Sequence, residues 1–550
     1  MSNKRYVIGI DFGTDSCRAA VINAENGAFV SNSTCVYPRW KEGRYCNPER
    51  SIYRQHPQDY IDALIKAVGE AVRLAGKDVS CCVRGIGVDT TASTPVLLDS
   101  KGIPLAMTPE FSEDPDAMFI LWKDHSAVAE ADEITKLAHK WNVDYTSYSG
   151  GAYSAEWAWS KVLHVLRTNS RVAQKASSWI EHCDWIVSWL TGAAEPAKVL
   201  HSRCAAGHKA MWNQDWQGLP SEDFLSSLDP RLALFRRNMY ENTFTSDVCA
   251  GILSKELAVI LGLPYDVKIA VGSVDAHVGA VGASVAEGVL TRIMGTSTCD
   301  ILVKSYSDTG ERRLNGICGQ VDGSVIPGMI GYEAGQAAFG DVFSWFRRLL
   351  MWPLTLLDKS PGETLEGIIF PELEKAAVQI DPAASSLLAL DWINGRRTPD
   401  PDQHVCGALT GITLGTSAPM LYRSLIEATA FGTRAIIDRF ETEGVYIGSV
   451  RAVGGVARKS PLVMQIMSDV IGRKVSVVDC DQACALGSGM FAAVASGLYP
   501  TIPDAQKAMQ SPVGTIYIPD MKTHSLYEKK YARYQGLGAF VQSFRIPPSK

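Results

Sequence analysis

The sequence predicts a mixed α/β protein built from two domains that share one plan. Its 550 residues exceed what a single hydrophobic core normally organises. Strand patterns alternate with helical patterns, which favours layered α/β domains with largely parallel sheets. A hairpin with a Gly-Thr turn also occurs twice. Together these observations predict one α/β domain over residues 1–285 and another over residues 286–550.

The first copy of the hairpin covers residues 6–22 and the second covers residues 291–303. In each copy an apolar run ends in a small polar turn, and a second strand-prone run follows. The hairpins add antiparallel strands, so both sheets are expected to be mixed. Aligned on the turn, the copies share four residue types: Gly13/Gly295, Thr14/Thr296, Cys17/Cys299 and Val21/Val303.

Further similarities between the halves support a duplication. In both, a strand enters a turn, and a later strand ends in aspartate before a helix of small residues. Any one similarity could arise by chance, but the elements keep the same order. The segments are residues 83–89, 269–275 and 276–286 in the first half and residues 450–456, 475–479 and 483–496 in the second.

Two other stretches have the spacing of amphipathic helices. Apolar residues recur at helical intervals over residues 59–74 and again over residues 419–440. Residues 350–405 instead are rich in Pro, Asp and Leu and show weak periodicity. We expect this last stretch to be an insertion or an irregular lid.

Composition limits the classes of partner. A net charge of −6 argues against a nucleic-acid partner, which would require a basic face.

The 13 cysteines form no Cys-x-x-Cys pair, so reduced thiols are expected instead of disulfides or zinc. No signal-peptide pattern or long apolar run occurs, which predicts a cytoplasmic protein without a membrane partner. Oligomeric state leaves no pattern, and a homodimer stays an open option.

The repeated Gly-Thr turn predicts a nucleotide triphosphate site. Glycine lets the backbone come close and adopt unusual dihedral angles, and hydroxyls and turn amides donate to phosphate oxygens. Two turns, one per domain, would hold ATP between them: Gly13, Thr14 and Asp15 in one and Gly295, Thr296 and Ser297 in the other. Asp11, just before the first turn, is placed to bind Mg²⁺. A single turn of this kind could be a plain hairpin, but the matched pair favours phosphate.

The ordered set of motifs resembles the FGGY carbohydrate kinases over roughly residues 5–500. The resemblance implies two actin-like (ribonuclease H-like) domains with a deep cleft between them, which binds ATP, Mg²⁺ and a sugar. The motifs are residues 11–14, 121–125, 155–161, 272–277, 295–298, 407–411 and 454–455. Met420 and Leu421 depart from a position where the family usually has a polar residue, which puts the local interdomain contacts in doubt.

Some segments are most similar to the branch of the family that phosphorylates L-ribulose. The resemblance therefore implies the conversion of L-ribulose to L-ribulose 5-phosphate in arabinose catabolism. Another family member acting on xylulose, D-ribulose or glycerol is the alternative, and an actin-like ATPase switch without a sugar is a third. The segments are residues 88–95, 122–126, 181–185, 207–212 and 331–336.

Asp275 is the leading candidate for a catalytic residue. A carboxylate is needed to accept the proton of the attacking hydroxyl in line with the γ-phosphoryl group. Asp275 ends an apolar strand, where a side chain projects toward a binding site, and it could also help to hold Mg²⁺. From the sequence alone a helix N-cap is an equal alternative, and it is the resemblance that favours the base.

The remaining site residues are implied by the resemblance. Lys209 and Glu333 are expected to bind sugar hydroxyls, although Lys and Glu are usually surface charges. Ala92 is expected to approach the sugar through its backbone. Gly454 and Gly455 are expected to let the chain pass the adenosine, with a simple strand-to-helix turn as the alternative. Weaker candidates are Trp122 and Asp124 for the sugar and Arg458 and Gln465 for adenine; His125, His208 and His277 lack metal-ligand spacing.

Overall fold

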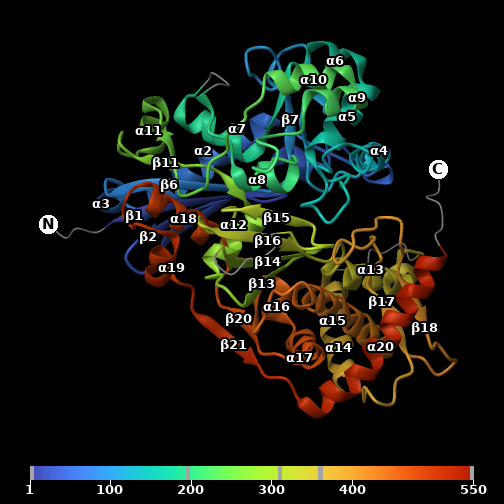
Figure 1. Cartoon of the computed structure of the whole chain (residues 1–550). Coiled ribbons are helices and arrows are strands. Elements are labelled where there is room, and N and C mark those ends of the chain that lie inside the picture. The colour runs from blue at the N-terminus through green and yellow to red at the C-terminus, as the bar shows by residue number, and fades with distance from the viewer. Residues whose placement is uncertain (1–4, 194–197, 307–312, 357–362, 545–550) are drawn as a thin grey trace.

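The computed structural model describes residues 5–193, 198–306, 313–356 and 363–544 and contains two large mixed sheets. Figure 1 shows the chain from blue at its N-terminus to red at its C-terminus, with the first sheet above the second. We refer to the residues before Val289 as the N-terminal half and to the rest as the C-terminal half. The predicted fold class, two sheet-rich α/β domains, is confirmed.

The first sheet has the strand order β10-β11-β6-β1-β2-β3, with β12 paired to β6. β1 pairs with β2 in antiparallel fashion and with β6 in parallel fashion, so the sheet is mixed. Its strands are β1 (Tyr6–Phe12), β2 (Ser16–Asn23), β3 (Phe29–Val36), β6 (Val83–Thr90), β10 (Cys249–Ile252), β11 (Lys268–Ala270) and β12 (Ser273–Val274).

The second sheet has the order β15-β16-β14-β13-β19-β20-β21. β13 is antiparallel to β14 and parallel to β19, as β1 is to β2 and β6. Its strands are β13 (Val289–Met294), β14 (Thr298–Ser305), β15 (Gly319–Asp322), β16 (Met329–Ala334), β19 (Ser449–Val453), β20 (Val475–Val478) and β21 (Val513–Tyr517).

The two sheets confirm the predicted duplication. The path β3-β2-β1-β6-β11-β10 corresponds strand for strand to β16-β14-β13-β19-β20-β21, with the same parallel and antiparallel pairings. The helices predicted after the aspartate-ending strands are also present, as α12 (Asp275–Gly282) and α18 (Ala483–Ala495). α12 ends four residues earlier than predicted.

Small residues let these two helices cross closely. A Cβ on Gly487 of α18 would lie 2.0 Å from the carbonyl oxygen of Val278 in α12. On its other side α18 packs against β1 and β6, where a Cβ on Gly9 would lie 1.7 Å from the carbonyl oxygen of Ala485. In Figure 1 the red α18 accordingly lies beside the blue strands of the first sheet. The C-terminal half thus contributes a helix to the N-terminal sheet, and the boundary at 285/286 stays a prediction.

The amphipathic helices are found where they were predicted, as α2 (Pro57–Ala75) and α15 (Ala418–Thr442). α2 covers the first sheet with a face that includes Leu64 and Val68, and α15 buries Phe431 in the core of the C-terminal half. Apart from α14, which is described below, the other α-helices in the described part of the chain are α1 (Pro38–Lys41), α3 (Lys77–Ser80), α4 (Val128–Ala138), α5 (Ala158–Thr168), α6 (Ser170–Lys175), α7 (His182–Thr191), α8 (Arg203–Lys209), α9 (Glu222–Leu228), α10 (Pro230–Arg237), α11 (Lys255–Leu261), α13 (Gly340–Met351), α16 (Gly455–Lys459), α17 (Pro461–Ile471), α19 (Ile502–Met509) and α20 (Met521–Ser543).

The prediction of an insertion or irregular lid over residues 350–405 is wrong for residues 363–378 and 388–390, which form a helix and a strand. α14 (Glu363–Val378) packs on α15, and β17 (Leu388–Leu390) pairs with β18 (Ala408–Thr410). Pro371 inside α14 and an irregular apolar pattern obscure this helix in the sequence. Residues 357–362 lie outside the described part. The short remaining strands of the chain are β4 (Cys46–Asn47), β5 (Ile52–Gln55), β7 (Pro95–Leu98), β8 (Phe119–Ile120) and β9 (Ser178–Glu181).

Candidate active site

Three aspartates meet at one edge of the first sheet. Asp11 of β1 lies opposite Asp89 of β6, and Asp275 directly follows β12, which pairs with the end of β6. The carboxyl ends of parallel strands share an edge, which explains why residues far apart in the sequence converge. Asp89 is buried and accepts a hydrogen bond of 2.6 Å from Ser488 of α18. Asp89 was not predicted as a site residue, although its place at the end of the predicted strand over residues 83–89 was a usable signal.

The surroundings of these carboxyl groups oppose their ionisation. Burial, followed by the charge of Asp11, raises the pKa of Asp275 to about 7. Burial also raises the pKa of Asp11, and the Arg18 guanidinium, 3.0 Å away, opposes that rise. Asp275 is the first residue of α12, while Val274 takes the N-cap position without a side-chain cap. Asp275 is therefore not the N-cap residue itself, although its carboxylate accepts a hydrogen bond of 2.6 Å from the N–H of Ala276 in the first turn.

Each Gly-Thr turn is closed by a hydrogen bond from its glycine, but the first turn is one residue longer than the second. The N–H of Gly13 donates to the carbonyl of Ser16, and the N–H of Gly295 donates to that of Ser297, both at 3.0 Å. Neither Gly13 nor Gly295 has a positive φ, so the expectation of unusual dihedral angles is wrong for both. A Cβ on Gly13 would lie 3.5 Å from the Arg18 guanidinium and one on Gly295 would lie 3.7 Å from the carbonyl oxygen of Ser297, so glycine here leaves space beside the turn.

Neighbouring loops fix both turns in place. The Trp122 indole N–H donates to the hydroxyl of Thr14 at 3.0 Å, and the Gln55 amide donates to its carbonyl at 2.6 Å. In the second turn the N–H of Phe339 donates to the carbonyl of Thr296 at 2.7 Å. Asp15, Gly295 and Thr296 are exposed, while Thr14 and Ser297 are partly buried. The turns therefore present polar groups from a fixed backbone.

Lys209 and Glu333 form a buried ion pair that joins the two halves. The Lys209 ammonium, at the end of α8, lies 2.8 and 2.9 Å from the two Glu333 carboxylate oxygens on β16. Both side chains are about 6% exposed. Burial opposes ionisation of Glu333, but the charge of Lys209, its hydrogen bond and the charges of His277 and His208 together outweigh burial and lower the Glu333 pKa to about 2. The same pairing raises the pKa of Lys209 against its burial.

Two imidazoles complete the surroundings of this pair. His208 Nδ1 lies 3.5 Å and His277 Nε2 lies 3.4 Å from Glu333 Oε2. Burial lowers the pKa of His277 to about 4, so it is neutral near pH 7. His208, His277 and Cys204 have potential ligand atoms within 4.8 Å of one another, a proximity that their sequence spacing did not reveal.

Ala92 lies beside the same residues. It follows the end of β6 and packs against Val274, which precedes Asp275, and against Cys204 and Ala205 of α8. The structure thus brings Ala92, Asp275 and the Lys209–Glu333 pair into one region, where the charges of Lys209 and Glu333 act on the pKa of Asp275. Positively charged, carboxylate and backbone groups in one place can bind several hydroxyls of a polyol at once.

Gly454 lies against the second turn. Its φ is 115°, and a Cβ there would lie 2.4 Å from the carbonyl oxygen of Met294, which precedes Gly295. The position therefore requires glycine. Gly455 begins α16 and is exposed. The strand-to-helix turn that was considered as an alternative is present between β19 and α16. It places Gly454 against the second Gly-Thr turn, with Gly455 next along the chain.

The side chains of the weaker candidates are paired with other side chains of the protein. Asp124 has no exposure and forms an ion pair with Arg54, so it is not available to a sugar. Arg458 pairs with Asp481, and Gln465 donates to Asp469 at 2.8 Å. Sequence reasoning gave no role to Arg397, which reaches Glu156 of the N-terminal half at 3.1 Å.

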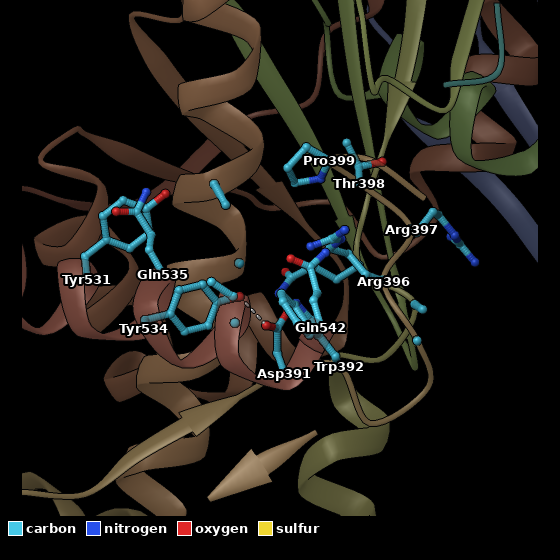
Figure 2. A pocket seen from close by; sticks show the side chains of 17 residues that line it. Asp391, Trp392, Arg396, Arg397, Thr398, Pro399, Tyr531, Tyr534, Gln535 and Gln542 are labelled. Atoms are coloured by element: carbon cyan, nitrogen blue, oxygen red, sulfur yellow. Dashed lines mark hydrogen bonds between the residues drawn. The ribbon is translucent and has the colours of Figure 1, made fainter. Parts of the chain in front are cut away.

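A separate cavity of about 210 Å³ lies between the loop over residues 391–399 and α20. Figure 2 shows Tyr534 donating to Asp391, a bond of 2.7 Å, while Arg397 extends away from the α20 residues. Gln336 connects this cavity to the second turn, because its N–H donates to the Thr298 hydroxyl at 2.9 Å. The cavity itself contains none of the carboxylates of the candidate active site.

Comparison with known proteins agrees with this architecture. Residues 6–282 match the N-terminal domain and residues 290–496 the C-terminal domain of the FGGY family of carbohydrate kinases. The chain belongs to the FGGY family of carbohydrate kinases, and it is an ATP-dependent sugar kinase with a small-molecule sugar as substrate. Among the described residues, every helix is too short or too polar to cross a bilayer.

Curated relatives cover nearly the whole chain. A ribulokinase of Vibrio parahaemolyticus is 47% identical over 98% of this chain and 97% of its own length. A ribulokinase of Shouchella clausii is 38% identical over 97% and 95%, respectively.

Solved structures share the fold at low identity. A xylulose kinase from Rhodospirillum rubrum has a TM-score of 0.77 at 20% identity, covering 98% of this chain and 99% of that one. A glycerol kinase from Plasmodium falciparum, solved with ADP, has a TM-score of 0.74 at 16% identity, covering 97% and 98%. At such identities the similarity establishes the fold and does not distinguish substrates.

Proposed function

We propose that the protein transfers the γ-phosphoryl group of ATP to L-ribulose, giving L-ribulose 5-phosphate and ADP. One observation of the structure carries the proposal: the buried Lys209–Glu333 pair lies beside Asp275, a carboxyl group whose pKa is about 7. The acceptor sugar is inferred from relatives named ribulokinase at up to 47% identity. The reaction would serve arabinose catabolism.

Asp275 acts as the general base. A base is most effective when its pKa lies near the working pH, and burial beside Asp11 gives Asp275 such a value. Its carboxylate takes the proton from the C5 hydroxyl as the oxygen of that hydroxyl attacks the γ-phosphorus and ADP departs. Lys209 donates to sugar oxygens, Glu333 accepts from sugar hydroxyls, and the backbone at Ala92 limits the sugar's position.

The two turns hold the triphosphate, and the Gly454–Gly455 segment passes beside the adenosine. Gly13, Thr14 and Asp15 would face one side of the phosphates, and Gly295, Thr296 and Ser297 the other. Support comes from the open space beside both glycines and from the fixed backbone of both turns. Phosphoryl transfer depends mainly on such positioning and on electrostatic stabilisation.

The donors at the sheet edge fit Mg²⁺. Asp11 and Asp275 offer the hard oxygen ligands that Mg²⁺ prefers, and the like charges there would be relieved by a cation. Asp11 and Asp275 would hold the ion, directly or through water. When bound, Mg²⁺ neutralises charge on the phosphate oxygens. We further propose a cytoplasmic location, and a homodimer as one arrangement of the chain.

A panel of acceptors tests the proposal. ADP release is coupled to a spectrophotometric readout with L-ribulose, D-ribulose, xylulose and glycerol, each varied at saturating Mg-ATP. L-Ribulose should give the highest kcat/KM. If another acceptor gives a higher value, the sugar assignment is wrong and the kinase assignment stands. ATP turnover without any sugar, together with ATP-driven polymerisation, would instead support an actin-like switch.

A further inference from the structure

Lys161 is a buried cation that connects two loops of the candidate site. It lies on α5 with 1% of its surface exposed. Its ammonium donates to the carbonyl oxygens of Ser93 and Leu121, both at 2.8 Å, and approaches that of Trp122 at 3.5 Å. A buried ammonium must donate its protons to compensate for lost hydration. The Ser93 loop and the Trp122 loop therefore share one donor group.

Glu181 holds the Ser93 loop from the opposite side. Its carboxylate accepts from the hydroxyl of Ser93 and, at 2.8 Å, from the N–H of Thr94. The hydroxyls of Thr91 and Thr94 lie 3.1 Å apart and close the loop. The residues on both sides of Ala92 are thus fixed by buried hydrogen bonds, while Ala92 itself stays partly exposed.

Burial and the neighbouring carboxylates have opposite effects on the charge of Lys161. Burial lowers the pKa of Lys161 to about 7, and the carboxylates of Asp124, Glu181 and Glu156 oppose that fall. Arg54 acts in the same direction as burial, but its own charge is paired with Asp124. The three protons of an ammonium match the three carbonyl oxygens around Lys161, two at 2.8 Å and a third at 3.5 Å.

The Trp122 loop continues to the first phosphate turn. The indole N–H of Trp122 donates to the hydroxyl of Thr14 at 3.0 Å. A continuous series of contacts therefore runs from the loop at Ala92, through Lys161 and Trp122, to Thr14. One end of this series belongs to the sugar subsite and the other to the phosphate subsite.

We propose that Lys161 is a positioning residue that sets the sugar-binding loop at Ala92 relative to the phosphate turn at Thr14. It acts through backbone carbonyls and does not touch the sugar or the reacting atoms. The proposal rests on the proposed function, because it assumes that Ala92 contacts the sugar and Thr14 the phosphates. If the proposal holds, loss of Lys161 should impair phosphoryl transfer to the sugar more than it impairs nucleotide binding.

The first test compares Lys161→Met with Lys136→Met, an exposed lysine on α4 that serves as a matched control. Lys161→Met keeps an unbranched side chain up to the ε position but leaves the carbonyls of both loops without their donor. Misplacement of a reactant by about 1 Å costs about 10²-fold in rate, and we expect a loss of that size in kcat/KM for the sugar. The Kd of ADP should stay within threefold of wild type, and Lys136→Met should behave as wild type.

A second variant covers the case in which Lys161→Met does not fold. Trp122→Phe keeps an aromatic ring but removes the N–H that reaches Thr14. It should raise the ratio of ADP formed to sugar phosphate formed above one, because water then competes for a misaligned phosphoryl group. A merely structural residue would not change this ratio.

The outcomes separate this proposal from the proposed function. All variants are assayed with the sugar that wild type uses best. A wild-type protein that phosphorylates no sugar overturns both proposals. A wild-type kinase whose folded Lys161→Met or Trp122→Phe variant keeps kcat/KM and a ratio of one overturns only the positioning role. Equal losses in sugar transfer and in ADP binding would also overturn it.

Discussion

At the scale of single residues, the site combines one titrating carboxyl group with an ion pair that does not titrate. Asp275 has a pKa of about 7, whereas the pKa of Glu333 is about 2 and that of Lys209 is raised. The difference follows from their partners, because Asp275 is buried beside another aspartate and Glu333 is buried against a cation. Between pH 5.5 and 8.5, Asp275 is therefore the group of these three that changes charge.

This difference predicts the pH dependence of catalysis. A raised carboxyl pKa means that Asp275 is protonated, and inactive as a base, below about pH 7. Bound Mg²⁺ would lower this pKa, so the logarithm of kcat/KM for the sugar should rise with a slope near one at low pH and level off at or below about pH 7. Initial rates at saturating Mg-ATP over this range provide the measurement. A profile that stays flat down to pH 5.5 would contradict the assignment of Asp275.

Glu333→Gln should weaken both sugar binding and the fold. Removing one partner leaves the buried Lys209 charge uncompensated, which typically costs about 3–5 kcal/mol. The loss of a charged hydrogen-bond acceptor, about 1.5–3 kcal/mol, should raise KM for the sugar about 10- to 100-fold. Denaturant unfolding and acceptor-dependent kinetics measure the two effects. Glu70→Gln, which breaks an exposed pair with Arg73 on α2, is the control and should change neither.

Sequence reasoning named most residues of this site but not how they are held. Asp275, Lys209 and Glu333 follow from motif resemblance, and the structure brings them together. Lys161 and Glu181 are in the quoted motifs, but their roles come from contacts over 68 and 88 positions of the chain. Such contacts depend on tertiary packing, which leaves no local pattern.

At the scale of elements, the crossing of α12 and α18 positions Asp275. Asp275 begins α12, and α18 lies against both α12 and the strands that carry Asp11 and Asp89. Small residues at the crossing let the helix backbones approach, as the 2.0 Å distance at Gly487 shows. The sequence predicted both helices from their small residues, whereas α14 escaped prediction because it contains Pro371.

Gly487→Ala should separate the two helices. The new methyl group would meet the carbonyl of Val278, so α12 must shift, at a cost of about 1–3 kcal/mol typical of overpacking. Because α12 carries Asp275, kcat should fall as well. Gly69→Ala on α2 is the matched control, because a Cβ at this position would have no neighbouring atom within 4 Å. The higher helix propensity of alanine should increase the free energy of unfolding by at most about 1 kcal/mol. Denaturant unfolding curves and kcat are measured for both variants. A Gly487→Ala variant with unchanged stability and unchanged kcat would contradict the close crossing of the two helices.

At the scale of the whole molecule, buried or partly buried ion pairs connect the two halves. Lys209 reaches Glu333, and Arg397 reaches Glu156 in the opposite direction. Arg397 also donates to the carbonyl of Thr298, at the start of β14 beyond the second turn, at 3.4 Å. The loop that carries Arg397 lies in the stretch expected to be an irregular lid. The structure gives it a defined role in joining the halves.

Arg397→Met should weaken ligand-induced closure of the halves. Glu156 loses its cationic partner across the interface, while His125 remains 3.1 Å away. We expect KM for ATP and for the sugar to rise together, and the decrease in radius of gyration on binding both ligands to shrink in small-angle scattering. Arg439→Met removes a contact to Asp400 within the C-terminal half and is the control. Equal behaviour of the two variants would contradict a role of Arg397 between the halves.

The central claim, that Asp275 is the base of a sugar kinase, is tested most directly by Asp275→Asn. Transfer from ATP to L-ribulose is measured by 31P NMR at pH 8, where the wild-type carboxyl group is ionised. The variant should fold and bind ADP like wild type, yet kcat should fall by at least about 10³-fold. A folded variant with near-normal turnover would contradict the claim.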